Sequence, residues 1–407
     1  MSSQSCTADV ACGAARPQAA PDATLVPAAF LALGTFAIGT EGFMIAPLLS
    51  TMAADFHMTV PHVALLVVVF TLTMALSSPI STVLTGRFRR RGTLLLAMSL
   101  FAVGNLLAAW SSSFGMLMAA RVMMAVASGL YVPNANALAG VIVAPAKRGS
   151  ALAIVSGGMT LAIALGLPLG GVVGHAFGWR ATFLAVGAMS LAAIVGIMAG
   201  IARDAGAGIP VATLSQRVAV IRQPAILRLL SVSLFWSIGA YAVYPYIAPY
   251  LASVLNYGAT GINATVSMWG LAAALGVTTG GALNDRLGSD RVVRLSLIVL
   301  GLSFWALALA TGLSPSVGAI PVLLGVASWG FSVWAFFPAQ MARLIAAGGP
   351  AQASLALALN TSTMYLGFSI GSAMGAGILG AGAIWGIGLL AGAAEGIALL
   401  LDRRVRS

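Results

Sequence analysis

The sequence predicts an all-α membrane protein of twelve transmembrane helices, arranged as two pseudo-symmetric six-helix bundles. Three observations predict this fold: too few charges for a water-soluble surface, long apolar runs, and patterns that recur in the two halves of the chain. Of the 407 residues, 60% are hydrophobic and 7% are charged, with a mean hydropathy of +1.01. Because a soluble domain carries about a quarter charged residues, lipid is the solvent that this composition fits.

Apolar runs of about 20 residues, the length of helix that crosses about 30 Å of hydrocarbon, recur along the whole chain. They are continuously apolar, whereas the strands of a membrane barrel would alternate over about ten residues. The expected spans are 24–47, 62–84, 93–111, 115–142, 150–174, 181–201, 226–250, 263–283, 292–312, 317–342, 353–377 and 379–401.

The polar stretches between these runs divide the chain. The first stretch is rich in Ala and Pro and is expected to be a disordered tail, in which Cys6 and Cys12 would stay reduced. The longest internal polar stretch is expected to link the two bundles. The predicted order is a cytoplasmic tail, an N-terminal bundle, a cytoplasmic linker, a C-terminal bundle and a second tail: 1–23, 24–201, 202–225, 226–402 and 403–407.

The basic residues predict the orientation in the membrane. The net charge is +11, but the Lys and Arg residues lie in short connections between spans rather than in a nucleic-acid-binding patch. All 20 of them except Arg121 and Arg180 lie in or beside the two tails and every second connection, which would all be on the same side of the membrane. By the positive-inside rule, both termini are then cytoplasmic, which requires an even number of crossings. We expect a multi-pass protein of the bacterial inner membrane.

The two halves share local patterns. Val-Ala-Ser at 126–128 recurs at 326–328, and the basic connection after the second span has a counterpart at the same offset after the eighth. Small residues stand at every fourth position of the fifth and eleventh spans: Gly158, Ala162, Gly166, Gly170 and Gly174, and Gly367, Gly371 and Gly375. Duplication of this kind is how many secondary transporters are built, with the substrate site between the repeats.

Small residues on one helix face let two backbones approach closely in lipid, so the fifth and eleventh spans are expected to pack tightly. In the fifth span Pro168 stands among glycines, in Gly-Leu-Pro-Leu-Gly-Gly at 166–171. Proline removes a backbone hydrogen bond and kinks a helix, so this segment is expected to change shape during transport.

Two connections carry a loop motif. The stretch 281–288, between the eighth and ninth spans, reads Gly-Ala-Leu-Asn-Asp-Arg-Leu-Gly. It resembles the loop signature of the major facilitator superfamily, in which an acid at a helix end holds a basic partner in one conformational state. The residues concerned are Gly281, Asp285, Arg286 and Gly288, and in the related stretch after the second span Arg87 and Arg90, with Thr85 in the place of the acid.

Further stretches resemble the drug and sugar exporters of this superfamily, which are twelve-helix proton antiporters. Residues 158–171 are similar to the antiporter signature, represented here by Gly158, Gly166, Pro168 and Gly170. Residues 39–49 resemble the first span of the arabinose-efflux and chloramphenicol-efflux branch, although the acid, Glu41, stands one position earlier than is usual there. The resemblance covers about residues 24 to 402 and places Arg121 where the family carries an arginine linked to proton coupling.

Three charged residues within spans are candidates for proton coupling: Glu41, Arg121 and Glu395. A charge at the bilayer centre costs about 2.5 to 3.5 kcal/mol on insertion scales. Neutralising a glutamate at pH 7 costs about 3.7 kcal/mol, so Glu41 is able to switch protonation state. Arg121 cannot discharge and is expected to pair with Glu41 or to snorkel to the outer surface. Glu395 lies near a helix end, where snorkelling is the alternative to a coupling role.

Aromatic and amide residues within spans are candidates for a substrate site: Tyr131, Asn134, Asn136, Trp236, Tyr241, Tyr244 and Asn360. Aromatic walls with a few amide groups suit a moderately apolar organic molecule. The alternative for each residue is helix packing or an interfacial anchor.

The sequence has no nucleotide-binding loop, no nucleophile arrangement and no metal-ligand cluster, so neither an enzyme nor a cofactor-dependent protein is expected. The prediction is a monomeric, proton-coupled exporter of small organic molecules, such as chloramphenicol-like drugs or sugars, that works by alternating access. An uptake permease for a metabolite and a non-transporting membrane sensor are the alternatives.

Overall fold

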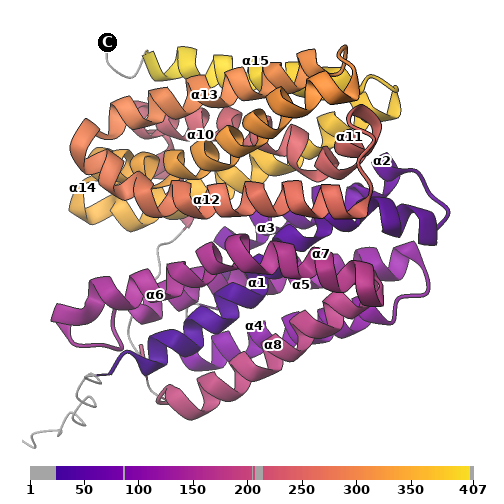
Figure 1. Ribbon diagram of the computed structural model, residues 1–407. Helices are drawn as coiled ribbons and strands as arrows, with labels where there is room; N and C mark the ends of the chain where they lie inside the picture. Colours follow the sequence, from indigo (N-terminus) through magenta and orange to yellow (C-terminus); the bar gives the residue numbers. More distant parts are fainter. Residues whose placement is uncertain (1–23, 86–87, 204, 207–213, 404–407) are drawn as a thin grey trace, which may run out of the picture.

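The computed structural model describes residues 24–85, 88–203, 205–206 and 214–403, and these residues form helices and connecting turns without strands. The predicted tail of 1–23, with Cys6 and Cys12, lies outside the described residues, as does Arg87. Figure 1 shows two layers of roughly parallel rods, an N-terminal bundle and a C-terminal bundle. This architecture is the predicted all-α membrane fold.

The N-terminal bundle has six rods, two of them made of consecutive helices. Its elements are α1 (Val26–Asp55), α2 (Val60–Val63) leading into α3 (Leu65–Leu84), α4 (Arg90–Ala109), α5 (Phe114–Ala139), η1 (Pro145–Lys147) leading into α6 (Arg148–Leu161), η2 (Ala162–Gly166) and α7 (Leu167–Phe177), and α8 (Trp179–Gly200). The first rod is longer than expected: the apolar run continues beyond Pro47, and α1 ends at Asp55.

The C-terminal bundle follows α9 (Leu214–Ile221), a helix within the predicted linker that packs on this bundle through Val220. Its elements are α10 (Pro224–Val243), η3 (Tyr244–Tyr246) and α11 (Ile247–Val254), which form one rod, then α12 (Ala259–Leu287), α13 (Ser289–Ala310), α14 (Pro315–Gly380) and α15 (Ile384–Arg403). The last rod begins later than predicted, because the turn between α14 and α15 includes Gly382 with φ of 73°.

The long element α14 consists of two rods. Gly349 has φ of 60° and ψ of 178°, a conformation open to glycine, and the chain kinks there. In the described chain, 11 helical segments are long and apolar enough to cross a membrane, among them Pro315–Gly349. The second part of α14, rich in Ser and Thr, is the eleventh rod in chain order and corresponds to the predicted span 353–377, so that the rods number twelve in the described chain.

The small-residue faces pack as expected. A Cβ added to Gly158 would collide with the backbone of Ala32 in α1, and one added to Gly170 would lie 2.6 Å from Met44 Cβ. In the second part of α14, a Cβ on Gly371 would collide with the carbonyl of Ile238 in α10. Close backbone approach therefore holds α6 and α7 to α1, and α14 to α10.

The predicted irregularity of the fifth span is a π-helical turn. The chain passes from α6 through η2 (Ala162–Gly166) into α7, just before Pro168. Because proline has no N–H to donate, the preceding turn loses a helical bond and widens.

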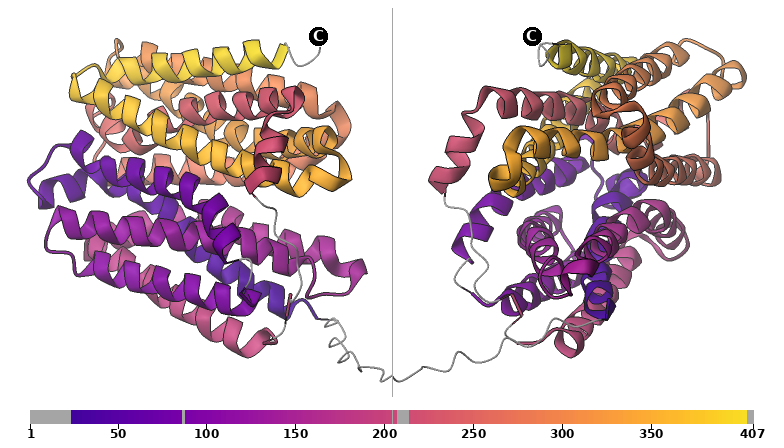
Figure 2. Two further views of the ribbon diagram at one scale, coloured as in Figure 1. Left: turned by 180° about the vertical axis from the view of Figure 1, so that it is seen from behind. Right: turned by 90° about the vertical axis from the view of Figure 1, so that its left-hand side faces the viewer.

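The two bundles meet at one end of the molecule. There the Tyr244 hydroxyl donates to the carbonyl of Phe43 (2.9 Å), and the Ser369 hydroxyl donates to the carbonyl of Val68 (3.0 Å). Figures 1 and 2 show the ribbons converging at the end where α2 and α11 lie and diverging toward the end where α1 begins and α15 ends. We call these the closed end and the terminal end.

Candidate functional site

Glu41 and Arg121 form an ion pair in the interior of the N-terminal bundle. The guanidinium Nη1 of Arg121, on α5, contacts Oε1 of Glu41, on α1, and both side chains are 0% exposed. Neither carboxylate oxygen accepts a hydrogen bond from another described residue. The pairing expected from the sequence is therefore present, and the alternative of an arginine snorkelling to the surface is wrong.

Arg121 is also held by α3. Its guanidinium carbon lies 4.1 Å from the centre of the Phe70 ring, and its Nε donates a long hydrogen bond of 3.5 Å to the carbonyl of Leu66. The arginine thus joins α1, α3 and α5 through a single charged group. Apart from this long hydrogen bond, the two charged groups have no hydrogen-bond partner among the described residues, so each charge depends on the other in this apolar interior.

A small aromatic chamber lies where the two bundles meet. Its cavity has a volume of about 10 Å³, and its walls come from α1, α10, η3, α12 and both parts of α14. We define the aromatic chamber by its lining residues: Phe43, Trp236, Ala240, Tyr241, Tyr244, Trp269, Trp329, Val333, Trp334 and Phe368. No charged side chain is among these described lining residues.

Phe43 is contributed by the N-terminal bundle and inserts its ring among aromatic side chains of the other bundle. The ring centroids lie 5.8 Å from Tyr244, 5.9 Å from Trp334 and 6.4 Å from Trp269. The pairs with Tyr244 and Trp334 are edge-to-face, and such pairs each contribute about 0.5–1.5 kcal/mol beyond area burial. Phe43 is therefore a main contact between the bundles as well as a wall of the chamber.

The ion pair and the chamber are neighbours. Glu41 and Phe43 are two positions apart on α1, and Tyr241, which lines the chamber, lies within electrostatic range of Arg121. The structure thus places a titratable group and its counter-charge, inside the N-terminal bundle, close to an aromatic chamber at the interface of the two bundles.

Three of the predicted substrate-site residues, Trp236, Tyr241 and Tyr244, line the chamber. Sequence reasoning missed the others, including Trp269 and Trp329. A signal was available in the accumulation of tryptophan within the apolar spans of the C-terminal half, but its convergence on one point depends on how α12 and α14 pack.

The structure places the remaining predicted substrate residues elsewhere. The Tyr131 hydroxyl donates to the carbonyl of Leu31 (3.1 Å) within the N-terminal bundle. Arg90 donates to Oδ1 of Asn134, which ties α4 to α5, and Asn136 donates to the carbonyl of Val132 in its own helix (3.2 Å).

Asn360 is buried in the second part of α14, and its Oδ1 has no hydrogen-bond partner among the described residues. It is not among the chamber-lining residues.

Glu395 is buried in the C-terminal bundle and is 1% exposed. A Cβ added to Gly239 of α10 would lie 2.6 Å from its Oε1, so the carboxyl group presses against the α10 backbone. Neither of its oxygens has a hydrogen-bond partner among the described residues. The position excludes snorkelling and puts the acid behind the helix that carries Trp236 and Tyr241.

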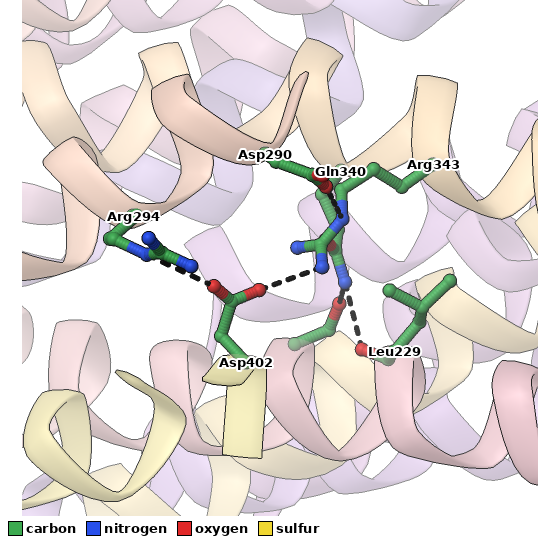
Figure 3. Close-up of polar contacts among 7 residues, drawn as sticks. Leu229, Asp290, Arg294, Gln340, Arg343 and Asp402 are labelled. Carbon is green, nitrogen blue, oxygen red and sulfur yellow. Dashed lines mark hydrogen bonds and ion pairs between the residues drawn. The ribbon is translucent and has the colours of Figure 1, made fainter. Parts of the chain in front are cut away.

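At the terminal end, an ionic network joins three helices of the C-terminal bundle (Figure 3). Arg343 of α14 pairs with Asp402 of α15 (2.7 Å) and with Asp290 of α13 (3.1 Å). Arg294 of α13 lies 3.7 Å from the other oxygen of Asp402. Arg343 and Asp402 are 6% and 1% exposed, so their separation would leave buried charge uncompensated.

Gln340 extends this network to α10 (Figure 3). Its Nε2 donates to the carbonyl of Leu229 (2.8 Å) and to the hydroxyl of Ser233 (3.0 Å), and its Oε1 accepts from Arg343 (3.3 Å). Four helices of the bundle are therefore tied at this end.

The predicted loop motif lies beside this network. Asp285 and Arg286 are exposed at the end of α12, and neither forms an ion pair with another described residue. Gly288, with φ of 82°, makes the turn into α13, whereas Gly281 faces open space. The acids that pair with arginine at this end are Asp290 and Asp402, which the sequence did not single out.

The sequence profile described as the Major Facilitator Superfamily matches residues 31–372. An uncharacterised MFS-type transporter of Bacillus subtilis, YbcL, is 30% identical over 85% of this chain and 86% of its own. A chloramphenicol resistance protein of Streptomyces lividans is 31% identical over 64% of this chain and 67% of its own. The crystal structure of a mutant form of the nucleoside transporter NupG superposes with a TM-score of 0.75 at 10% identity over 94% of this chain and all of its own.

Proposed function

The chain belongs to the major facilitator superfamily and is a membrane transporter rather than an enzyme, and we propose that it exports small organic molecules in exchange for protons. The observation that carries this proposal is the fully buried Glu41–Arg121 pair beside the aromatic chamber. A proton-driven exchanger needs a group that changes charge close to the substrate site, and Glu41 is a buried titratable group two residues from the chamber-lining Phe43.

In the proposed cycle, protonation of Glu41 breaks its ion pair and leaves the charge of Arg121 uncompensated. A buried charge that has lost its partner costs about 3–5 kcal/mol, enough to move a two-state equilibrium by two or more orders of magnitude. The unpaired charge of Arg121 is then stabilised by new contacts that form in the alternative conformation. A membrane potential adds about 2.3 kcal/mol per charge per 100 mV to the driving force. Glu395 is a second candidate for carrying protons.

The proposed orientation places the terminal end in the cytoplasm of a bacterial cell, as the positive-inside rule indicates. Because the bundles meet at the opposite end, the structure would then represent an inward-facing state. Closure at the terminal end and separation of Phe43 from Tyr244 would give the outward-facing state.

Export is favoured over uptake by the antiporter-like Gly158–Gly171 segment and by the chloramphenicol resistance relative. Drugs of the chloramphenicol kind are the leading substrate class, and sugars are the second. An uptake permease remains the alternative, with a sensor that does not transport as a further one.

The proposal is tested in vesicles that contain the purified protein and carry an imposed pH gradient. Addition of chloramphenicol should release protons from vesicles with the wild-type protein and should not do so with Glu41→Gln. Asp55→Asn is the matched control, because Asp55 is also paired with an arginine but is about 40% exposed. The double variant Glu41→Gln/Arg121→Gln, with two neutral groups, should fold and also fail to exchange. Undiminished proton release from either Glu41 variant would refute the coupling role.

A further inference from the structure

The tryptophans of the aromatic chamber carry polar groups that the protein does not satisfy. Trp236, Trp269, Trp329 and Trp334 each have a buried indole N–H without a hydrogen-bond partner among the described residues. A buried donor without an acceptor costs about 1–3 kcal/mol, and most buried polar groups in proteins have a partner. Four such donors around a single cavity indicate that something other than the protein supplies acceptors.

In this state the chamber has room for at most about one water molecule. A cavity needs about 10–15 Å³ to hold one water molecule, and the chamber has about 10 Å³. A single water would leave most of the four donors unsatisfied. The acceptors must therefore arrive when the chamber opens.

Phe43 shows what kind of group the chamber accommodates. Its ring is surrounded by Tyr244, Trp269 and Trp334 of the opposite bundle, at centroid distances of 5.8 to 6.4 Å. When the bundles separate at the closed end, this ring withdraws and leaves a space with the size and lining of an aromatic group. Phe43 is thus a plug that belongs to the other half of the protein.

The electrostatics of the chamber favour an uncharged ligand. Aromatic faces attract cations, but none of the described lining residues is an acid that would compensate a positive charge. An anion would need a free counter-charge, and Arg121 is already paired with Glu41. A sugar would need several donors and acceptors, whereas the lining offers few acceptors.

We propose that the chamber binds a neutral, flat aromatic molecule bearing hydrogen-bond acceptors such as nitro, carbonyl or ether oxygens, and that its ring takes the place of Phe43. This inference rests on the proposed function for the view that the chamber is the transport site. It selects the aromatic drug class over sugars and over cationic dyes.

Binding to the purified protein in detergent tests the inference without a proton gradient. Four probes with one ring each are compared by equilibrium dialysis against protein-free micelles: nitrobenzene, isopropylbenzene, benzoate and phenyltrimethylammonium. Nitrobenzene should bind most tightly. Trp269→Phe and Trp329→Phe each keep an aromatic ring but remove an indole N–H. If the N–H that is removed donates to the nitro group in the wild-type protein, the nitrobenzene affinity of that variant should fall roughly threefold to tenfold. Isopropylbenzene, which has no acceptor, should change less than twofold in that variant.

A further variant, Phe43→Ala, removes the plug and should increase the affinity for both neutral probes. Tighter binding of benzoate or phenyltrimethylammonium than of nitrobenzene would overturn the neutral class. Equal losses for both neutral probes, or no loss of nitrobenzene affinity in either tryptophan variant, would overturn the role of the indole donors. If these results appear but vesicles show no proton exchange, the proposed antiport fails while the ligand assignment stands.

Discussion

Replacing the two members of the buried ion pair one at a time should destabilise the protein in different ways. In Glu41→Gln, Arg121 keeps its charge, and its remaining contacts are the Phe70 ring at 4.1 Å and the Leu66 carbonyl at 3.5 Å. Breaking a fully buried pair by removing one partner costs about 3–5 kcal/mol. Because arginine stays protonated, this loss should not change between about pH 5.5 and pH 7.5.

Arg121→Gln leaves Glu41, which can take up a proton and become neutral. Glutamate titrates near pH 4.3 in an unfolded chain, and each pH unit above that value adds about 1.4 kcal/mol to the cost of holding the proton. The folded variant then binds a proton that the unfolded chain releases, so its stability falls as the pH rises. Between about pH 7.5 and pH 5.5 the deficit of this variant should shrink by up to about 2.7 kcal/mol.

The assay is equilibrium unfolding in mixed micelles at the two pH values, for both single variants and the double variant. The double variant should lose less than the sum of the singles, since it leaves no unpaired charge behind. Asp55→Asn serves as the control: its pair with Arg180 is 2.6 Å long but about 40% exposed, and such pairs contribute less than about 1 kcal/mol. Equal losses of both single variants at both pH values, or strict additivity, would refute this account of the pair.

Three further predictions concern packing and charge. Gly371→Ala should reduce stability by about 1–3 kcal/mol through overpacking against the α10 backbone, whereas Gly377→Ala, in open space, should not change the unfolding midpoint. Arg343→Gln should destabilise the C-terminal bundle because it leaves the buried Asp402 with only the longer contact to Arg294, while the exposed Arg291→Gln should leave the melting temperature unchanged. Glu395→Gln should keep the fold, since the carboxyl group has no basic partner to lose among the described residues, and vesicle assays of this variant will show how much proton exchange passes through that acid.

The rods and their tight contacts were predictable from the sequence. A helix in lipid must make its backbone hydrogen bonds within itself and must keep most polar side chains away from lipid. The length and hydropathy of a segment therefore predict a transmembrane helix without knowledge of its neighbours. The two rows of glycines, one with Gly158 and the other with Gly371, likewise identify the packing faces of their helices. Small residues at every fourth position lie on one helix face and allow a neighbouring backbone to approach closely in lipid. The rows do not identify the partner helix, which is α1 for Gly158 and α10 for Gly371.

The site was predictable in part. Glu41 and Arg121 stand out as charges within apolar spans, and each has few partners to choose from. The aromatic chamber and the ionic network depend instead on side chains contributed by several helices. The pairing of Arg343 with both Asp290 and Asp402 is invisible in the sequence, where the motif acid Asp285 is more conspicuous but lies exposed in the structure. Which acid meets an arginine is decided by helix packing at that end.

The position of α1 would let the proposed proton and ligand sites influence each other without a long pathway. Glu41 and Phe43 are two residues apart, so their side chains point about 200° apart around the helix axis. One faces Arg121 within its own bundle, and the other enters the chamber of the opposite bundle. In the proposed mechanism, a ligand that displaces Phe43 would move α1 relative to α10, and a proton on Glu41 would release α1 from α5. Because linkage is reciprocal, a proton that changes ligand affinity through α1 obliges the ligand to change proton affinity by the same factor.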